Sequence, residues 1–154
     1  MVKDYRKCVG MMIINIKKEV LVGKRIDHPS GYWQMPQGGI DENENPEEAV
    51  WREMREEIGT NNANMIKQSK QWINYEIPSE TLVTLPWGNI YVGQTQMWFA
   101  FKFKGNEEEI DTNTENPEFS EWKWTHHHLL VENIVPFKRE VYKKILIEFK
   151  ELFN

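Results

Sequence analysis

The sequence predicts a single α/β domain in which a mixed sheet lies between helices. Strand-like and helix-like segments alternate along the 154 residues, without an internal repeat or a low-complexity linker. Hydrophobic residues make up 40% of the chain and charged residues 28%, which is typical of a globular protein. We therefore expect one domain over residues 1–154.

Composition also excludes several classes of protein. No run approaches the ~20 apolar residues of a membrane-spanning helix, and the N-terminus lacks a secretory cleavage site, so we expect a cytoplasmic protein without a membrane partner. The single cysteine, Cys8, excludes an internal disulfide and a cysteine-based zinc site, and we expect it to be buried. The net charge of −5 argues against a bulk polyanion binder, so we expect no DNA partner. Bound metal ions can still bring phosphates to an acidic site.

The first third of the chain is expected to form a hairpin and a loop. Residues 8–16 are an apolar run suited to a buried strand, and residues 17–19 turn the chain into a second strand at residues 20–25. A Gly/Pro-rich loop is expected over residues 27–41.

The clearest helix is expected over residues 46–58. Asn45 is a good N-cap, Pro46 suits the first helical position, and Glu48 completes a capping box. Gly59 fits a left-handed C-cap. The core-facing residues would be Val50, Met54 and Ile58.

The remaining chain is expected to form three strands and a final helix. The strands are predicted at residues 72–78, 94–103 and 119–124, with a solvated turn at residues 107–109. The final helix is predicted over residues 136–153, with an apolar stripe made of Val141, Ile145, Phe149 and Leu152.

Three glutamates are placed together on the helix over residues 46–58. Glu53 and Glu57 are four residues apart and Glu56 is three from Glu53, so all three carboxylates share one face. Such a face is most often simply solvated. The glycines in residues 36–39 allow close approach to a ligand, however, and carboxylate clusters select Mg²⁺ or Mn²⁺. We expect Arg52 to hold the Glu56 carboxylate by a bidentate pair.

Residues 38–60 resemble the Nudix hydrolase signature, Gly-x5-Glu-x7-Arg-Glu-apolar-x-Glu-Glu-x-Gly-apolar. Only the last position differs, where Thr60 replaces an aliphatic packing residue. Further segments resemble one subfamily, the bacterial RNA pyrophosphohydrolases with the closely similar diadenosine tetraphosphate hydrolases; these segments are residues 5–6, 31–40, 117–124 and 136–142. The resemblance implies the Nudix fold, in which the signature (the Nudix box, residues 38–60) forms a loop-helix-loop.

The resemblance also implies a metal site of two or three Mg²⁺ or Mn²⁺ ions. The implied ligands are Glu53, Glu56, Glu57, Glu118 and the main-chain carbonyl of Gly39. All four glutamates are candidate catalytic residues, and Glu118 is also a candidate to orient or deprotonate the attacking water. Which carboxylate is the base stays open. Glu44 and Arg52 are expected to be structural.

Seven residues are expected to bind substrate. The resemblance places Arg6 at the 5′ phosphates, although a solvated arginine is an alternative. Arg25, Phe137 and Lys138 would receive the nucleotide, with the base stacked between arginine and phenylalanine; Phe137 is alternatively a core residue. Pocket-lining groups would be Gln37, Tyr75 and Gln94. We also expect a basic group to gather around the site: Arg6, Lys24, Arg25, Lys138 and Arg139.

The expected reaction is hydrolysis of the 5′ di- or triphosphate end of RNA to a 5′ monophosphate. The alternative reaction is asymmetric cleavage of diadenosine polyphosphates into ATP and AMP. A non-catalytic Nudix binding module is a third possibility, but such modules typically lose box carboxylates that this chain retains. Whether an auxiliary protein stimulates the enzyme stays open. The tract of residues 126–128 (His-His-His) resembles a metal-binding tract, but no acidic or cysteine partner lies at ligand spacing nearby, so it is interpreted as a surface turn.

Overall fold

The computed structural model describes residues 4–27 and 31–154; residues 28–30 of the predicted loop and residues 1–3 lie outside it. The strands are β1 (Tyr5–Ile14), β2 (Val20–Arg25), β3 (Trp33–Gln34), β4 (Gln37–Gly39), β5 (Ala63–Gln68), β6 (Ile73–Glu76), β7 (Gly93–Phe103) and β8 (Phe119–Thr125). The helices are α1 (Pro46–Ile58), α2 (Ser79–Leu82), α3 (Leu130–Asn133) and α4 (Arg139–Glu148). Short 3₁₀ turns are η1 (Glu107–Glu109), η2 (His127–Leu129), η3 (Pro136–Lys138) and η4 (Lys150–Phe153).

The strands form one mixed sheet. Its central pair, β1 and β7, is parallel from Tyr5↔Gly93 to Ile14↔Lys102. The other pairings are antiparallel, with β2 beside β1, β5 and β6 beside β7, and β8 beside β2. The predicted mixed sheet is therefore confirmed.

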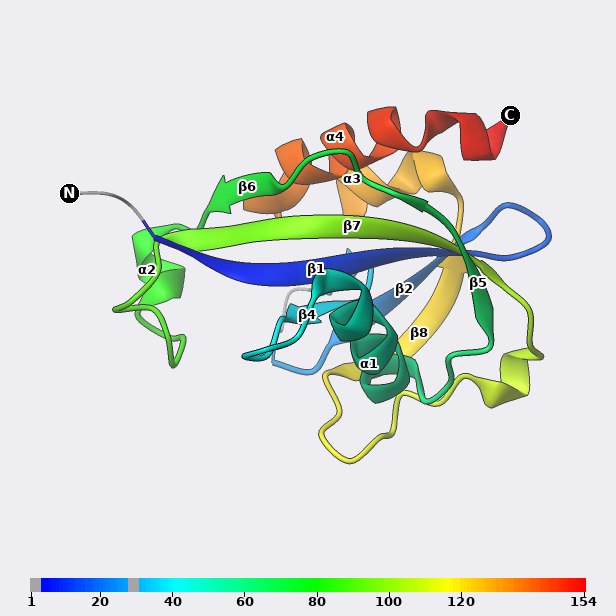
Figure 1. The fold of residues 1–154 in the computed structure, drawn as a ribbon, viewed down its shortest axis with the longest axis horizontal. Coiled ribbons are helices and arrows are strands. Elements are labelled where there is room, and N and C mark those ends of the chain that lie inside the picture. Colours follow the sequence, from blue (N-terminus) through cyan, green and yellow to red (C-terminus); the bar gives the residue numbers. More distant parts are fainter. Residues whose placement is uncertain (1–3, 28–30) are drawn as a thin grey trace.

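Helices cover both faces of the sheet, α1 on one side and α3 and α4 on the other (Figure 1). The alternation of side chains along β1 supplies both cores. Val9, Met11 and Ile13 pack in the cluster that includes α1. Met12 and Ile14 pack in the opposite cluster, which includes α4. The predicted sandwich is thus confirmed.

Helix α1 has the predicted residues and caps. The Asn45 side chain accepts the Glu48 N–H at 2.8 Å, and the Glu48 carboxylate accepts the Asn45 N–H at 3.1 Å. Gly59 ends the helix in the left-handed region, with φ of 74°. The capping box fixes the start of the helix relative to the loop that precedes it, which positions the glutamates.

Several regions differ from the prediction. The first strand runs from Tyr5 to Ile14 instead of over residues 8–16, and the short helices α2 and α3 were not expected. The loop expected over residues 27–41 contains β3 and β4, because backbone pairing with β2 and β1 forms these strands in a segment with weak strand propensity. Strand β5 was not expected, because its sequence is largely polar and it is held by pairing with β7. The helix expected over residues 136–153 is divided into η3, α4 and η4, although Val141, Ile145 and Phe149 of its stripe are buried.

Within residues 4–27 and 31–154, no helix combines the length and apolar character needed to span a bilayer.

Candidate active site

The glutamates of α1 meet Glu118 around a small cavity. Glu53 and Glu57 are buried, at 8% and 5% exposure, whereas Glu56 is exposed. Glu118 immediately precedes β8, and its carbonyl oxygen accepts the Ile26 N–H at 2.9 Å, which ties this loop to the end of β2. All four carboxylates line one cavity of about 340 Å³.

Arg52 connects this acidic face to the preceding loop. Its Nε and Nη2 donate to both oxygens of Glu44 at 2.8 and 2.9 Å, and Nη2 also donates to the Gly39 carbonyl at 2.8 Å. Its Nη1 donates to Glu53 at 2.9 Å and to Glu56 at 3.1 Å. The predicted bidentate pair with Glu56 is therefore wrong. Glu44 takes the bidentate edge because it reaches the guanidinium from the loop, while Glu56 contacts one nitrogen from the same helix.

Burial disfavours the charged forms of the Glu53 and Glu57 carboxyl groups. Burial raises the pKa of Glu53 to about 7, although Arg52 opposes the shift. Burial also raises the pKa of Glu57, and the neighbouring Glu118 carboxylate raises it further. Among the described residues, the buried Glu57 Oε2 has no hydrogen-bond partner. A hard divalent cation fits this set of oxygens, because it supplies the missing charge and the missing ligand bond.

The binding of Mg²⁺ is expected to strengthen about tenfold between pH 6 and pH 8. Glu53, with a pKa of about 7, must lose its proton before it can bind a metal ion. Isothermal titration of Mg²⁺ at the two pH values measures this change. Equal affinity at both would contradict the assignment of Glu53 as a ligand.

Without divalent ions, the stability of the protein is expected to fall as pH rises from about 4.5 to about 7. The folded state keeps the Glu53 proton up to about pH 7, whereas the unfolded carboxyl loses it near its ordinary pKa of 4.5. The folded state therefore binds more protons in this window, and the free energy of unfolding decreases with pH. Denaturant titrations in EDTA measure the free energy of unfolding. A rise in stability between pH 4.5 and pH 7 would contradict this prediction.

Two glycines let the loop approach these side chains. A Cβ added at Gly38 would overlap the carboxyl group of Glu53, and one added at Gly39 would overlap the guanidinium of Arg6. The signature glycine at position 38 is therefore explained by the close contact between strand β4 and helix α1.

Gly38→Ala is expected to lower kcat/KM at least ~10²-fold with little change in fold, because a displacement of Glu53 by about 1 Å disturbs the reacting geometry. Steady-state kinetics and circular dichroism measure both properties. The matched control is Gly105→Ala, whose added Cβ would meet the carboxyl end of the Glu109 side chain. Equal activity of the two variants would contradict the positioning of Glu53 by Gly38.

A larger cavity of about 710 Å³ adjoins the acidic one and shares Glu53 and Glu118 with it. Its volume lies within the range of small-molecule sites. All seven residues predicted to bind substrate line this cavity: Arg6, Arg25, Gln37, Tyr75, Gln94, Phe137 and Lys138. The fold thus brings together residues from β1, β2, β4, β6, β7 and η3.

A buried polar network forms one wall of the larger cavity. Gln94 Oε1 accepts hydrogen bonds from the Tyr75 hydroxyl at 3.0 Å, from Gln96 at 2.9 Å and from Gln37 at 3.3 Å. Gln96 in turn accepts the Trp98 indole N–H at 2.8 Å. The network fixes these amides in one orientation, as a preformed surface for a polar ligand.

Lys138 is a buried cation on this wall. Its Nζ lies 3.4 Å from Gln34 Oε1 and 3.5 Å from Gln37 Oε1, so neutral amides are its hydrogen-bond partners. Burial, assisted by the charge of Arg25, lowers the pKa of Lys138 to about 7. A phosphate group beside Lys138 would favour its charged form.

Aromatic and cationic side chains line other parts of the larger cavity. Tyr75 and Phe137 are stacked, with ring centroids 6.2 Å apart and planes 20° from parallel. The Arg6 guanidinium lies over the Trp87 ring, 5.3 Å from its centroid. Arg25 is held by a bidentate pair with Asp27 at 2.7 and 2.6 Å.

The expected basic group is only partly assembled. Arg6, Arg25 and Lys138 line the cavity, but Lys24 and Arg139 are not among its lining residues. Lys24 pairs instead with Glu121 of β8 at 4.0 Å. Arg139 donates instead to the Glu132 carbonyl at 3.3 Å. The prediction was wrong for these two residues.

Three functional candidates were missed in the sequence. Gln34 and Trp87 line the larger cavity, and Gln96 belongs to its buried network. The signal for Gln96 was present, since Gln94 and Gln96 are two residues apart in an apolar strand and share one face. Trp87 follows α2 in an irregular segment, where no periodic pattern places a side chain.

The NUDIX domain model matches residues 4–145. The chain belongs to the Nudix family. A Nudix relative from Wolbachia pipientis subsp. Culex pipiens (strain wPip), named RNA pyrophosphohydrolase, is 47% identical over 153 residues, which cover 99% of this chain and 93% of the relative. A relative of the same name from Orientia tsutsugamushi (strain Boryong) is 50% identical over 145 residues, 94% of this chain and 89% of the relative.

Solved structures agree on the Nudix fold. The E. coli dihydroneopterin triphosphate pyrophosphohydrolase superposes with a TM-score of 0.69 at 20% identity, covering 94% of this chain and 99% of the other. The C. elegans Ap4A hydrolase superposes with a TM-score of 0.65 at 15% identity, covering 98% of this chain and 100% of the other. The predicted Nudix fold is thus confirmed.

Proposed function

We propose that this protein is an RNA pyrophosphohydrolase, which converts 5′-tri- or diphosphate ends of RNA to 5′-monophosphate ends and thereby initiates messenger decay. The observation that carries the proposal is the sharing of Glu53 and Glu118 by the two cavities. A nucleotide in the larger cavity has its polyphosphate beside the acidic one. The relatives named RNA pyrophosphohydrolase, at 47% and 50% identity, support this substrate.

The proposed cofactor is Mg²⁺ or Mn²⁺, with two or three ions. The ligands proposed are Glu53, Glu56, Glu57, Glu118 and the Gly39 carbonyl, which keeps a second lone pair beside its bond from Arg52. When bound, these ions lower the pKa of the attacking water, polarise the phosphoryl group and neutralise the leaving group.

The chain's own residues position the substrate. The polyphosphate is bound by the positive charges of Arg6, Arg25 and Lys138. The buried polar network on the cavity wall holds the nucleotide beside them. Glu118 is exposed and lines both cavities, so it is the candidate to orient or deprotonate the attacking water. Positioning of this kind is the main contribution of a protein to phosphoryl transfer.

Phe137→Ala is expected to lower kcat/KM on 5′-triphosphate RNA about tenfold, mainly through KM. Stacking of a base on an aromatic ring contributes about 1–3 kcal/mol, and Phe137 is half-buried at the cavity wall. Phe137→Tyr is the matched control and should keep most of the activity. If alanine and tyrosine variants both matched the wild type, Phe137 would be a packing residue only.

Cleavage of diadenosine polyphosphates into ATP and AMP is the second candidate function. It is favoured by the presence of two aromatic surfaces in the cavity, the Tyr75–Phe137 pair and Trp87, because such a substrate carries two bases.

The products formed from γ-labelled 5′-triphosphate RNA test the proposal. We expect release of the terminal phosphates and RNA that a 5′-monophosphate-dependent exonuclease degrades. RNA that stays resistant to this exonuclease, with active Mg²⁺- or Mn²⁺-loaded protein, would overturn the RNA assignment.

A further inference from the structure

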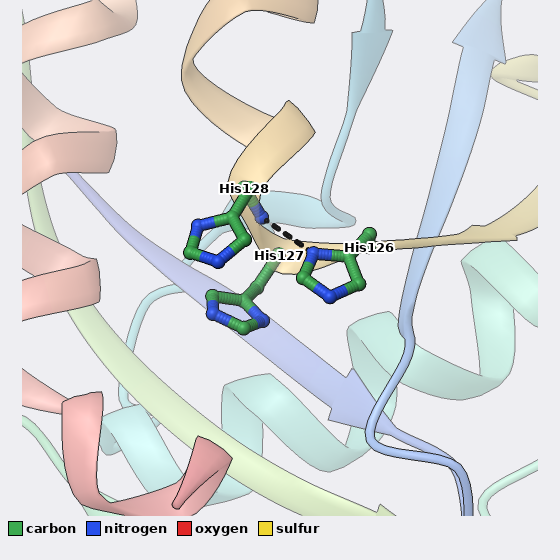
Figure 2. Close-up of side chains that lie close together, drawn as sticks. All are labelled: His126, His127 and His128. Carbon is green, nitrogen blue, oxygen red and sulfur yellow. Dashed lines mark hydrogen bonds between the residues drawn. The ribbon is translucent and has the colours of Figure 1, made fainter.

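Three consecutive histidines form a cluster where β8 meets η2 (Figure 2). The ring centroids of His126, His127 and His128 are 4.2 to 4.7 Å apart. One ring nitrogen from each lies within 4.8 Å of the others. The predicted surface turn is confirmed, since His126 and His128 are exposed and the segment forms a 3₁₀ turn. The turn also gathers three imidazoles at one place.

The cluster is separate from the acidic cavity. Glu118 immediately precedes β8 and His126 immediately follows it. A strand of seven residues places the two positions about 25 Å apart. An ion at the histidines therefore cannot share ligands with the ions proposed at the glutamates.

The rings are held together before any ligand binds. His127 stacks on Phe153 of η4, with centroids 4.1 Å apart and planes 20° from parallel. His126 Nδ1 accepts the His128 backbone N–H at 3.3 Å, a long and exposed bond that a ligand can replace.

The chemistry of the cluster selects its ligand. Imidazole nitrogens suit Zn²⁺, Ni²⁺ and Cu²⁺, whereas Mg²⁺ and Mn²⁺ prefer carboxylate oxygens. At metal–nitrogen distances of about 2.0–2.1 Å, tetrahedral ligands lie about 3.4 Å apart. The present spacing of up to 4.8 Å is wider, so coordination requires the exposed rings of His126 and His128 to rotate toward the ion. We propose that His126, His127 and His128 form a second metal site for Zn²⁺ or a similar transition ion, with water completing the coordination.

Zn²⁺ titration of the whole protein, followed by the ¹H–¹⁵N signals of the histidine rings, tests the proposal. Mg²⁺ is present throughout, and the histidine ring signals report binding at the cluster separately from any Zn²⁺ that binds the carboxylates. We expect the signals of His126, His127 and His128 to shift together and to saturate, while His28, the remaining histidine of the sequence, is unaffected.

Variants identify the ligands. His127→Ala is expected to weaken Zn²⁺ binding at the cluster at least ~10-fold, and replacement of all three histidines by alanine is expected to lower the bound Zn²⁺ by one equivalent. His28→Gln is the matched control and should bind as the wild type. Hydrolysis in Mg²⁺ should be unchanged in every variant. Ring signals that do not move, or a triple variant that binds as many equivalents of Zn²⁺ as the wild type, would overturn the site.

Discussion

Glu57→Gln is expected to lower kcat/KM at least ~10³-fold while the metal-free protein stays folded. Glu57 is 5% exposed, and its Oε2 has no partner among the described residues. The amide keeps the shape of the side chain but removes the negative charge that holds a cation. Because the carboxylate is buried beside Glu53 and Glu118, its neutralisation should leave the metal-free melting temperature unchanged or raise it.

Kinetics with Mg²⁺ and thermal unfolding in EDTA measure the two effects together. Glu53→Gln should behave in the same way, since Glu53 is buried on the same face of α1. Glu47→Gln is the control, because Glu47 is exposed in the first turn of that helix. A Glu57→Gln variant with the turnover of the control would show that Glu57 does not hold the metal.

Arg52→Lys is expected to lower kcat/KM about 10²-fold and the free energy of unfolding by about 1–2 kcal/mol. Lysine keeps the charge but has no planar fork for the two oxygens of Glu44. It would lose the bidentate pair and leave the Gly39 carbonyl and Glu53 without the guanidinium that joins them. The loss of stability is moderate because the Arg52 side chain keeps 27% exposure.

A double-mutant cycle that combines Arg52→Lys with Glu44→Gln isolates the interaction energy between Arg52 and Glu44 from their other contacts. Because Glu44 and Arg52 act together, the double variant should be little worse than either single variant, with a coupling of about 1 kcal/mol or more. Urea denaturation of the four proteins gives the coupling. Strictly additive losses would mean that Glu44 and Arg52 contribute independently.

Local signals in the sequence were sufficient for some elements of the fold. The Asn45–Glu48 capping box and Gly59 lie within one segment, so the bounds of α1 followed from neighbouring residues. Strands β3, β4 and β5 depend instead on pairing with strands distant in sequence. Propensity and periodicity do not contain that information.

The site residues also divide into those that local sequence predicts and those that depend on the tertiary structure. The acidic face of α1 could be predicted from the sequence, because helical spacing alone brings Glu53, Glu56 and Glu57 together. The hydrogen-bond partners of Arg52 could not be predicted, because they depend on how the loop that carries Glu44 folds back over the helix. Gln34 and Trp87 required the full tertiary structure, which brings strand β3 and the segment after α2 to the cavity wall.

The ratio of kcat/KM for 5′-triphosphate RNA and diadenosine tetraphosphate, measured with Mg²⁺ in one mixture, tests the proposed function most directly. A 5′-diphosphate RNA in a parallel reaction shows how many phosphates the site needs. We expect a preference of at least about tenfold for RNA. A preference of the same size for the dinucleotide would contradict the RNA assignment, and this cavity would then belong to an enzyme that clears dinucleoside polyphosphates.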